Sequence, residues 1–298
     1  MHFENSSLKR QKTSLILSIA LNLAFALAEF IAGLFANSLT LISDSLHDLS
    51  DSFALTLSYF GLRMAQLSPN QKRTFGYKKI RILTAFLNAL ILVVLTIIVL
   101  RAAILRILNP ETVRSSVLVG MAIIGIIING TAIFLLRRDH ASLSIRAAML
   151  HLLEDFLGWI TVLVGGLIIH FTKWYIIDPI LSIGISAFVI YGAYKILRES
   201  TSILIDSTPK DLNFAEIQKF VLNYNSKIID LHDLHIWTIG EGERALMAHI
   251  VVNDNLISSY YPLLKDLECA LMKNFQSTHV TLELECDQCK SGENICNP

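Results

Sequence analysis

The sequence predicts a membrane protein with a bundle of six transmembrane α-helices, followed by a small α+β domain of ferredoxin-like type. The chain is 53% hydrophobic and 17% charged, whereas charged residues make up about 25% of an ordinary soluble domain. Its mean hydropathy is +0.54. Long apolar runs dominate up to about Leu204, and a mixed polar pattern follows. We therefore expect three parts: an N-terminal segment 1–13, a membrane domain 14–204 and a polar domain 205–298.

Six stretches are long enough to cross a bilayer, which takes about 20 mainly apolar residues. They cover residues 14–36, 40–65, 80–105, 114–137, 143–170 and 177–204. Basic residues precede the first stretch as in a signal peptide, but no small-residue cleavage site follows it. We therefore expect a retained first span. The second and fifth stretches are the most polar of the six.

Lysine and arginine concentrate in the loops on one side of the predicted membrane domain, and this bias sets orientation. That side carries Lys9, Arg10, Lys12, Lys72, Arg73, Lys78, Lys79, Arg81, Arg137, Arg138, Arg146, Lys195 and Arg198. The opposite side carries only Arg106, Arg114 and Lys173. Both termini are therefore expected in the cytoplasm. The formal net charge of zero argues against nucleic acid as a partner.

The tail predicts the order α-β-β-α-β. "NFAEIQKFVLNY" and "YYPLLKDLECALMKNF" have helical periodicity, and Asn213 is suited to cap the first of these helices. "IIDLHDLHIWTI", "ERALMAHIVV" and "HVTLELE" are typical of strands. This order suits two helices on one face of an antiparallel sheet.

Two matching His–Asp pairs lie inside the predicted spans. His47 and Asp51 are four residues apart, as are His151 and Asp155, so each pair shares one face of its helix. Asp44 lies on nearly the same stripe as His47. Two imidazoles and two carboxylates make a complete tetrahedral ligand set for zinc.

Ionisable groups at bilayer depth are costly and mark ion pathways. The alternative is that each pair forms a hydrogen-bonded contact between helices. Two matching pairs in the two most polar spans favour a metal site over that alternative.

The chain resembles the cation diffusion facilitator family of zinc-exporting transporters. The motifs that carry the resemblance are "SDSLHDLSD", "FGYKKIRIL", "HLLED", "DPI" and "HDLHIW", and together they span nearly the whole sequence. The resemblance implies a homodimer that exchanges a divalent metal for protons, with the metal at His47, Asp51, His151 and Asp155. In this family, His in the second-span pair is associated with zinc over manganese or iron.

The chain departs from the family at two places. Arg81 stands where many members have Glu, and the loop between the fourth and fifth spans is short, without the His-rich segment of many eukaryotic members. These departures favour a compact bacterial-type exporter of the inner membrane.

Two further pairs resemble family positions. Asn22 and Glu29 lie seven apart on one face of the first span, where packing or lining a water path is favoured over ligating metal. Lys79 and Asp206 suggest a charge pair between a loop and the end of the sixth span, with solvated surface charges as the alternative.

The tail holds a second candidate metal site. His232, His249 and His279 fall in or beside the three predicted strands, and Glu285 follows on the last. Because side chains alternate along a regular strand, His232 and His235 are not expected on one face, and we prefer His232. Family members bind regulatory zinc near this set; surface histidines are the alternative.

The four cysteines all lie in the tail. Cys286 and Cys289 form a C-x-x-C pair, which in a reducing cytosol reads better as half a metal site than as a disulfide. It resembles the C-terminal cysteine pair of some vertebrate vesicular zinc carriers, and His2 is a candidate further ligand. Cys269 is expected to be a buried helix residue, and Cys296 lies near the end of the chain.

These observations predict a zinc efflux transporter, not an enzyme, that exports Zn²⁺ by proton antiport and is regulated by zinc at the tail. Cd²⁺ is a further expected substrate, and affinity alone does not exclude cobalt or nickel. The alternatives are an intramembrane metalloenzyme and a membrane-anchored metal sensor. "HLLED" lacks the H-E-x-x-H order of metalloproteases, and a sensor would not need charged pairs inside the membrane.

Overall fold

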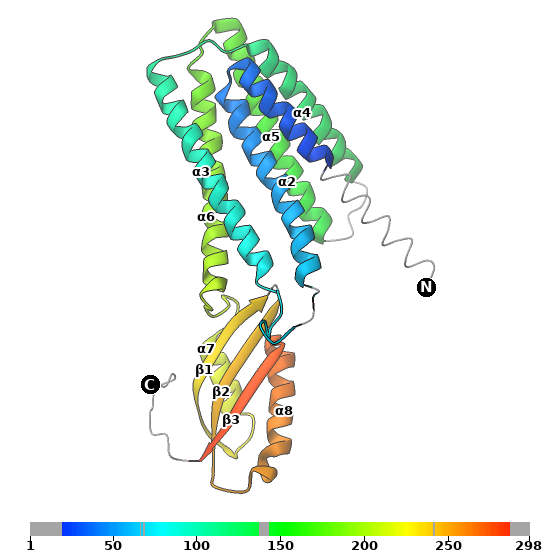
Figure 1. Cartoon of the computed structure of the whole chain (residues 1–298), viewed down its shortest axis with the longest axis vertical. Helices are drawn as coiled ribbons and strands as arrows, with labels where there is room; N and C mark the ends of the chain where they lie inside the picture. The colour runs from blue at the N-terminus through cyan, green and yellow to red at the C-terminus, as the bar shows by residue number, and fades with distance from the viewer. Residues whose placement is uncertain (1–19, 66, 68, 137–142, 241, 287–298) are drawn as a thin grey trace, which may run out of the picture. The chain divides into compact units, whose positions relative to one another are not determined.

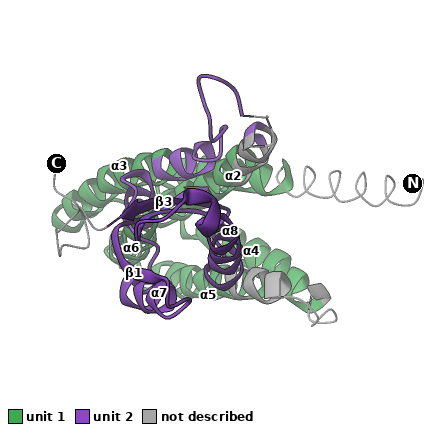
Figure 2. Ribbon diagram, turned by 90° about the horizontal axis from the view of Figure 1, so that it is seen from below, with its two compact units in different colours: residues 1–57, 87–196 green, residues 58–86, 197–298 purple. Residues whose placement is uncertain are grey.

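The computed structural model describes residues 20–65, 67, 69–136, 143–240 and 242–286. At a few helical positions, His151 among them, it describes the backbone alone. The chain forms two compact units (Figure 2). The first comprises residues 1–57 and 87–196, and the second comprises residues 58–86 and 197–298. The second unit thus includes the ends of three long helices together with the polar tail.

Each of the six predicted spans contains a helix (Figure 1). The helices are Ala20–Ala36, α2 (Leu39–Ala65), α3 (Ile80–Leu108), α4 (Ser115–Leu136), α5 (Leu143–Thr172) and α6 (Ile177–Leu204). Among the described residues, four stretches are long and apolar enough to cross a membrane: Ile80–Leu108, Ser115–Phe134, Leu152–Thr172 and Ile177–Leu204. The helical membrane domain is confirmed, and its second helix is the polar one.

The start of α2 is fixed by Asp178 in the first turn of α6. The Asp178 side chain is completely buried. It accepts hydrogen bonds from the Ser38 hydroxyl at 2.5 Å and from the Leu39 backbone N–H at 2.8 Å. A carboxylate stabilises a helix N-terminus because it satisfies free N–H groups and complements the helix dipole. This contact joins α2 to α6 about two helical turns before His47.

The helices α4 and α5 pack closely around Trp159. The indole is only 2% exposed, and a Cβ atom on Gly125 of α4 would lie 2.2 Å from it. Gly125 therefore allows the backbone of α4 to approach the ring. Phe25 of the first helix contacts the same ring edge-on, with 5.8 Å between ring centroids. These contacts hold α5, which carries one of the two predicted metal-binding pairs.

The tail has the predicted order of elements. They are α7 (Phe214–Leu222), β1 (Ile228–Gly240), β2 (Glu243–Val252), α8 (Ile257–Phe275) and β3 (His279–Cys286) (Figure 1). Asn213 caps α7 as predicted, because its side-chain oxygen accepts the Ala215 N–H at 3.0 Å.

The sheet is mixed, so the prediction of an antiparallel sheet is wrong for β3. The strand order is β1-β2-β3; β1 runs antiparallel to β2, and β3 runs parallel to β2. Parallel neighbours require a crossover connection, and α8 provides it. Apolar side chains of α7, α8 and one sheet face form a single core, with Ile217, Leu246, Ile250 and Leu267 at most 2% exposed. We call the other face of the sheet, on which His232, His249 and Glu285 lie, the polar face.

A β-bulge interrupts β1 beside these polar side chains. His232 pairs with His249, and His235 pairs with Met247, so three steps along β1 match two along β2. Asp233 takes up the extra length with φ of 50°. Beyond an extra residue, the side chains of a strand alternate again, but each points to the face opposite to the one expected from a regular strand. His232 and His235 therefore share a face, which corrects the expectation from a regular strand.

Candidate metal centres

A cavity of about 430 Å³ lies among α2, α5 and α6. Asp44 and His47 line it from α2, and Glu154 and Asp155 line it from α5. The α6 side chains that complete the lining are apolar. Carboxylates and an imidazole around a cavity between membrane helices are the groups that bind and pass cations. We call the predicted set His47, Asp51, His151 and Asp155 the membrane centre.

On α2, His47 and Asp51 lie one helical turn apart. His47 Nε2 is 3.9 Å from Asp51 Oδ2. His47 Nδ1 is buried and has no hydrogen-bond partner among the described residues. A neutral imidazole with an unused ring nitrogen is available as a nitrogen ligand for zinc.

On α5, Asp155 lines the cavity, and His151 lies one turn before it in the same helix. The side chain of His151 lies outside the described residues. Glu154 also lines the cavity, although it is not one of the predicted ligands. The cavity is wide enough to include both neighbouring carboxylates. The sequence does not reveal how wide the cavity is, so only the structure identifies Glu154 as a lining residue.

The two polar residues predicted on the first helix have different surroundings. Asn22 donates a hydrogen bond to the Ser52 hydroxyl of α2 at 3.1 Å. Glu29 is completely buried, and neither of its carboxyl oxygens has a hydrogen-bond partner of good geometry among the described residues. A buried carboxyl without such a partner is costly. Asn22 therefore links the first helix to α2, whereas packing does not account for Glu29.

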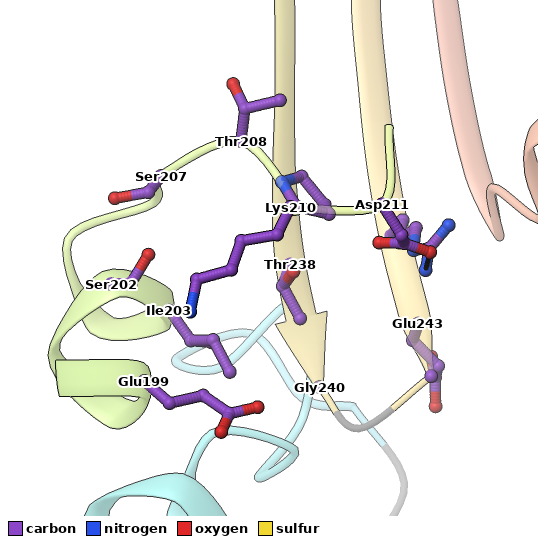
Figure 3. A pocket seen from close by; sticks show the side chains of 13 residues that line it. Glu199, Ser202, Ile203, Ser207, Thr208, Lys210, Asp211, Thr238, Gly240 and Glu243 are labelled. Atoms are coloured by element: carbon purple, nitrogen blue, oxygen red, sulfur yellow. Dashed lines mark hydrogen bonds and ion pairs between the residues drawn. The ribbon is translucent and has the colours of Figure 1, made fainter. Parts of the chain in front are cut away.

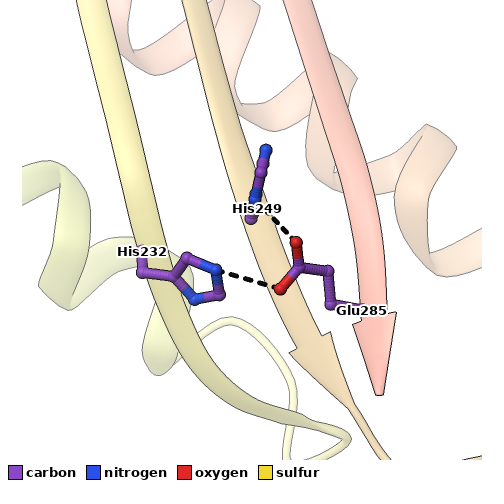
Figure 4. Close-up of side chains that lie close together, drawn as sticks. All are labelled: His232, His249 and Glu285. Atoms are coloured by element: carbon purple, nitrogen blue, oxygen red, sulfur yellow. Dashed lines mark ion pairs between the residues drawn. The ribbon is translucent and has the colours of Figure 1, made fainter. Parts of the chain in front are cut away.

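On the polar face of the sheet, His232, His249 and Glu285 come together from all three strands (Figure 4). We call this set the cytoplasmic cluster. Glu285 lies between the imidazoles, with Oε2 3.0 Å from His232 Nε2 and Oε1 2.8 Å from His249 Nδ1. One ligand atom from each residue lies within 4.8 Å of the others.

The cytoplasmic cluster fits a metal ion better than a hydrogen-bond network. His232 is 2% exposed, yet neither of its ring nitrogens forms a hydrogen bond of good geometry with the described residues, nor does His249 Nδ1. Their nitrogens are close to Glu285 but not aligned for proton donation. Two neutral imidazoles and one carboxylate make a usual three-ligand zinc set.

The structure separates one predicted residue, His279, from this cluster. His279 opens β3 opposite Ala245, whereas Glu285 pairs with Val251 near the other end; six residues of strand span about 20 Å. His279 instead contacts the Phe75 ring, with 5.4 Å between centroids. His279 was predicted to join the cluster because it lies in or beside a strand. Its position along that strand could not be predicted from the sequence.

The cysteine predictions have mixed outcomes. Cys286 ends β3 and is exposed with a free thiol, whereas Cys289, Cys296 and His2 lie outside the described residues. The expectation that Cys269 is buried is wrong, because it is exposed. The buried positions of α8 include Leu267 and Leu271, and Cys269 lies halfway between them on the outer side of the helix.

The bulge adds residues that sequence reasoning passed over. Asp233 Oδ1 lies 3.0 Å from His235 Nε2, and Asp233 Oδ2 lies 3.6 Å from His249 Nε2. Glu283 Oε2 is also 3.6 Å from His249 Nε2. His249 therefore faces Glu285 through one ring nitrogen and Asp233 through the other. In a regular strand the "HDLH" spacing places the two histidines on opposite faces. The extra residue of the bulge places them on the same face.

Two lysines tie the loop before α3 to the tail within the second unit. Lys79 Nζ lies 2.6 Å from Asp206 Oδ1, so the structure brings these two predicted residues together. The adjacent Lys78 forms an ion pair with Glu243 at the start of β2, which the sequence analysis did not anticipate. The two pairs hold this loop to the linker after α6 and to the β1–β2 hairpin.

A cavity of about 320 Å³ lies between the end of α6, the linker after it and the turn joining β1 to β2 (Figure 3). Among the described residues that line it there is no His or Cys. Its charges are mixed: Arg244 lies 2.5 Å from Asp211, and Glu199 and Glu243 line the cavity together with Lys210. This mixed-charge cavity is not a candidate zinc site.

A helical bundle that keeps carboxylates and an imidazole around a cavity between its helices defines an integral, multi-pass membrane protein of the ion-translocating class. Comparison with known families identifies it further. Residues 15–205 match the cation efflux transmembrane domain, and residues 209–286 match the cytoplasmic domain of cation efflux proteins. The chain therefore belongs to the cation efflux, or cation diffusion facilitator, family. Its members are transporters, so the prediction that the chain is not an enzyme is confirmed.

Curated relatives match the chain along most of its length. The metal cation efflux system protein CzcD of Cupriavidus metallidurans is 34% identical over 281 residues, covering 94% of this chain and 88% of the relative. The cadmium, cobalt and zinc/H(+)-K(+) antiporter of Bacillus subtilis is 32% identical over 278 residues, covering 92% and 89%. The zinc transporter ZitB of Escherichia coli is 31% identical over 277 residues, covering 92% and 88%.

Proposed function

We propose that this protein exports Zn²⁺ from the cytoplasm in exchange for protons, with the metal carried by the membrane centre of His47, Asp51, His151 and Asp155. The observation that carries the proposal is the cavity that Asp44, His47 and Asp155 line between α2, α5 and α6. Two ionised carboxylates and two neutral imidazoles would balance the charge of one Zn²⁺ ion. Relatives named as zinc, cadmium and cobalt transporters support zinc as substrate and Cd²⁺ as a second one.

Proton coupling follows from the chemistry of these ligands. Metal binds the deprotonated forms of His and Asp, so the affinity for zinc falls as pH falls. In a cytoplasm-facing state the ligands lose protons and take up Zn²⁺; in the outward-facing state, incoming protons displace it. His47 and His151 are the proposed proton carriers, because an imidazole can accept and release a proton. A relative named as an H(+)-K(+) antiporter supports this exchange.

Three polar residues near the membrane centre are proposed to carry protons or water toward it. Asp44 lines the cavity beside His47. Asn22 and Glu29 lie on the first helix, where Glu29 is a buried carboxyl that packing does not explain. A carboxyl that is neutral in one state and charged in another accounts for keeping Glu29 inside the membrane.

The tail is proposed to sense zinc and to hold two protomers together. The cytoplasmic cluster would bind a regulatory Zn²⁺ ion. Cys286 and Cys289 are proposed to contribute to a second, separate metal-binding site. Homodimer formation is supported by the match to the family's cytoplasmic domain. The ion pair of Lys79 with Asp206 would link this domain to the membrane helices.

The proposed topology follows from the positive loops. Both termini lie in the cytoplasm, residues 14–204 form the membrane domain, and residues 205–298 form the cytoplasmic domain. The short loop between α4 and α5 and the bacterial relatives support a bacterial inner membrane.

Zinc flux in proteoliposomes tests the proposal. Wild-type protein and Asp51→Ala would be compared with a zinc dye inside the vesicles, with and without a pH gradient. Uptake that needs the gradient and is lost in Asp51→Ala supports antiport through the membrane centre. Zinc binding without flux under any gradient would overturn the proposal and favour a membrane-anchored sensor.

A further inference from the structure

A second cavity in the second unit, of about 400 Å³, lies between the loop before α3, the first turn of α3 and the end of α6. We call it the basic cavity. Lys72, Arg73 and Lys79 supply its cations, and Phe75, Leu83 and Leu204 supply much of its apolar lining. No carboxylate is present among the described residues that line it. The charged side chains described in its wall are therefore all cationic.

Two of the three cations have no acidic partner in the described parts of the chain. Lys79 is paired with Asp206, but no ion pair involves Lys72 or Arg73. The Arg73 guanidinium lies over the Tyr77 ring, 4.4 Å from its centroid. Stacking on a ring face leaves the edge of a guanidinium, with its N–H donors, open to an oxyanion. The cavity thus offers two uncompensated positive charges.

The loop that carries these cations is held in a defined fold. The Asn70 side-chain oxygen accepts hydrogen bonds from the backbone N–H groups of Lys72 and Arg73, each at 3.0 Å. Gly76 adopts φ of 72° and donates its N–H to the Arg73 carbonyl at 2.9 Å, a conformation that glycine adopts without strain. The cations are therefore positioned before any ligand binds.

The basic cavity lies where two membrane helices end. α3 begins at Ile80 and α6 ends at Leu204, and both helices are long and apolar enough to cross a bilayer. Phe75 is 41% exposed and Leu83 is 44% exposed. Aromatic side chains concentrate at membrane–water interfaces, and basic residues beside a span attract acidic lipids. The cavity combines both features beside the ends of these two helices.

We propose that the basic cavity binds the phosphate of an anionic phospholipid, with Lys72 and Arg73 on the phosphate and Phe75 and Leu83 against the upper acyl chain. This lipid site is distinct from both metal centres and goes beyond the proposed transport. The mixed-charge cavity of Figure 3 offers a contrast, because carboxylates also line it and one of them, Asp211, is paired with Arg244. An anionic ligand would gain little there and much in the basic cavity.

Native mass spectrometry of the full-length protein, released from detergent with phosphatidylglycerol or phosphatidylcholine, tests the proposal. Wild-type protein should retain phosphatidylglycerol in preference to net-neutral phosphatidylcholine. The double variant Lys72→Gln/Arg73→Gln should bind phosphatidylglycerol about 10-fold more weakly, because each basic residue beside a membrane contributes to lipid attraction. Lys210→Gln, which removes one positive charge from the mixed-charge cavity, should bind it as the wild type does.

Further arms separate lipid binding from its alternatives. The charge-conserving double variant Lys72→Arg/Arg73→Lys should keep the binding, which distinguishes lost charge from a damaged fold. Equal retention of both lipids by the wild type, or wild-type affinity in the double glutamine variant, overturns the proposal. Displacement of phosphatidylglycerol by excess inorganic phosphate also overturns it, because the cavity would then be a site for free anions.

Discussion

The membrane centre and the cytoplasmic cluster offer similar ligands on different scaffolds. The membrane centre takes each proposed ligand pair from a single helix, at positions four residues apart, and its cavity also borders α6. The cytoplasmic cluster takes one proposed ligand from each of three hydrogen-bonded strands. Ligands on separate helices change their spacing when the helices move, whereas backbone hydrogen bonds hold strand ligands in register. The first arrangement suits a metal that must leave, and the second suits one that stays.

The substitution with the largest expected effect should abolish zinc flux through the membrane centre without changing zinc binding by the cytoplasmic cluster. Asp155→Asn should reduce gradient-driven zinc flux to the background of protein-free vesicles, because it removes an anionic ligand while leaving the cytoplasmic domain intact. Zinc binding by the cytoplasmic cluster should persist in the same preparation. Flux assays and equilibrium dialysis on one sample measure both quantities. Transport that survived this substitution would show that the metal takes another route.

The second effect concerns the cytoplasmic cluster. His249→Ala, made in the Asp155→Asn background so that only tail binding is counted, should weaken zinc binding by about 100-fold or more, beyond the 10- to 100-fold cost of losing a supporting group. In the otherwise wild-type protein, the same substitution should leave basal flux in place and remove its rise with cytoplasmic zinc. Isothermal titration calorimetry measures the affinity. An unchanged affinity would exclude His249 as a ligand.

A smaller effect is expected at the bulge. Asp233→Asn should weaken zinc binding by the cytoplasmic cluster about 10-fold, because outer carboxylates orient histidine ligands. Asp230→Asn, an exposed carboxylate on the same strand, is the matched control and should leave the affinity unchanged. Titration of both variants at one pH makes the comparison. Equal losses in the two would indicate a general effect of negative charge.

The smallest effect is expected for Glu154, which lines the membrane cavity but lies outside the predicted ligand set. Glu154→Gln should change zinc flux by less than about threefold, since an exposed charge contributes little to a nearby interaction. Initial rates at several zinc concentrations would measure it. A loss as large as that of Asp155→Asn would make Glu154 a ligand and sharpen the contrast with the sheet-bound cluster.

The same contrast explains what the sequence could and could not predict. The pairs on α2 and α5 are visible because helical geometry relates residues four apart within one segment. The cytoplasmic cluster depends on strand register, which no local pattern encodes. His279 was therefore grouped with residues at the other end of β3, and the bulge that turns His235 to the polar face was missed. The parallel direction of β3 likewise depends on how α8 crosses the sheet.

The bulge also has a consequence for protein engineering. Asp233 is the one extra residue in β1 between His232 and His235, so deleting it would restore regular alternation between these two histidines. Leu234 would still face the core, and both histidines would keep their common face. A codon deletion therefore offers a way to remove the Asp233 carboxylate without introducing a new side chain. Insertion or deletion of a single residue in β1, as well as substitution, can therefore change the groups that surround the cytoplasmic cluster.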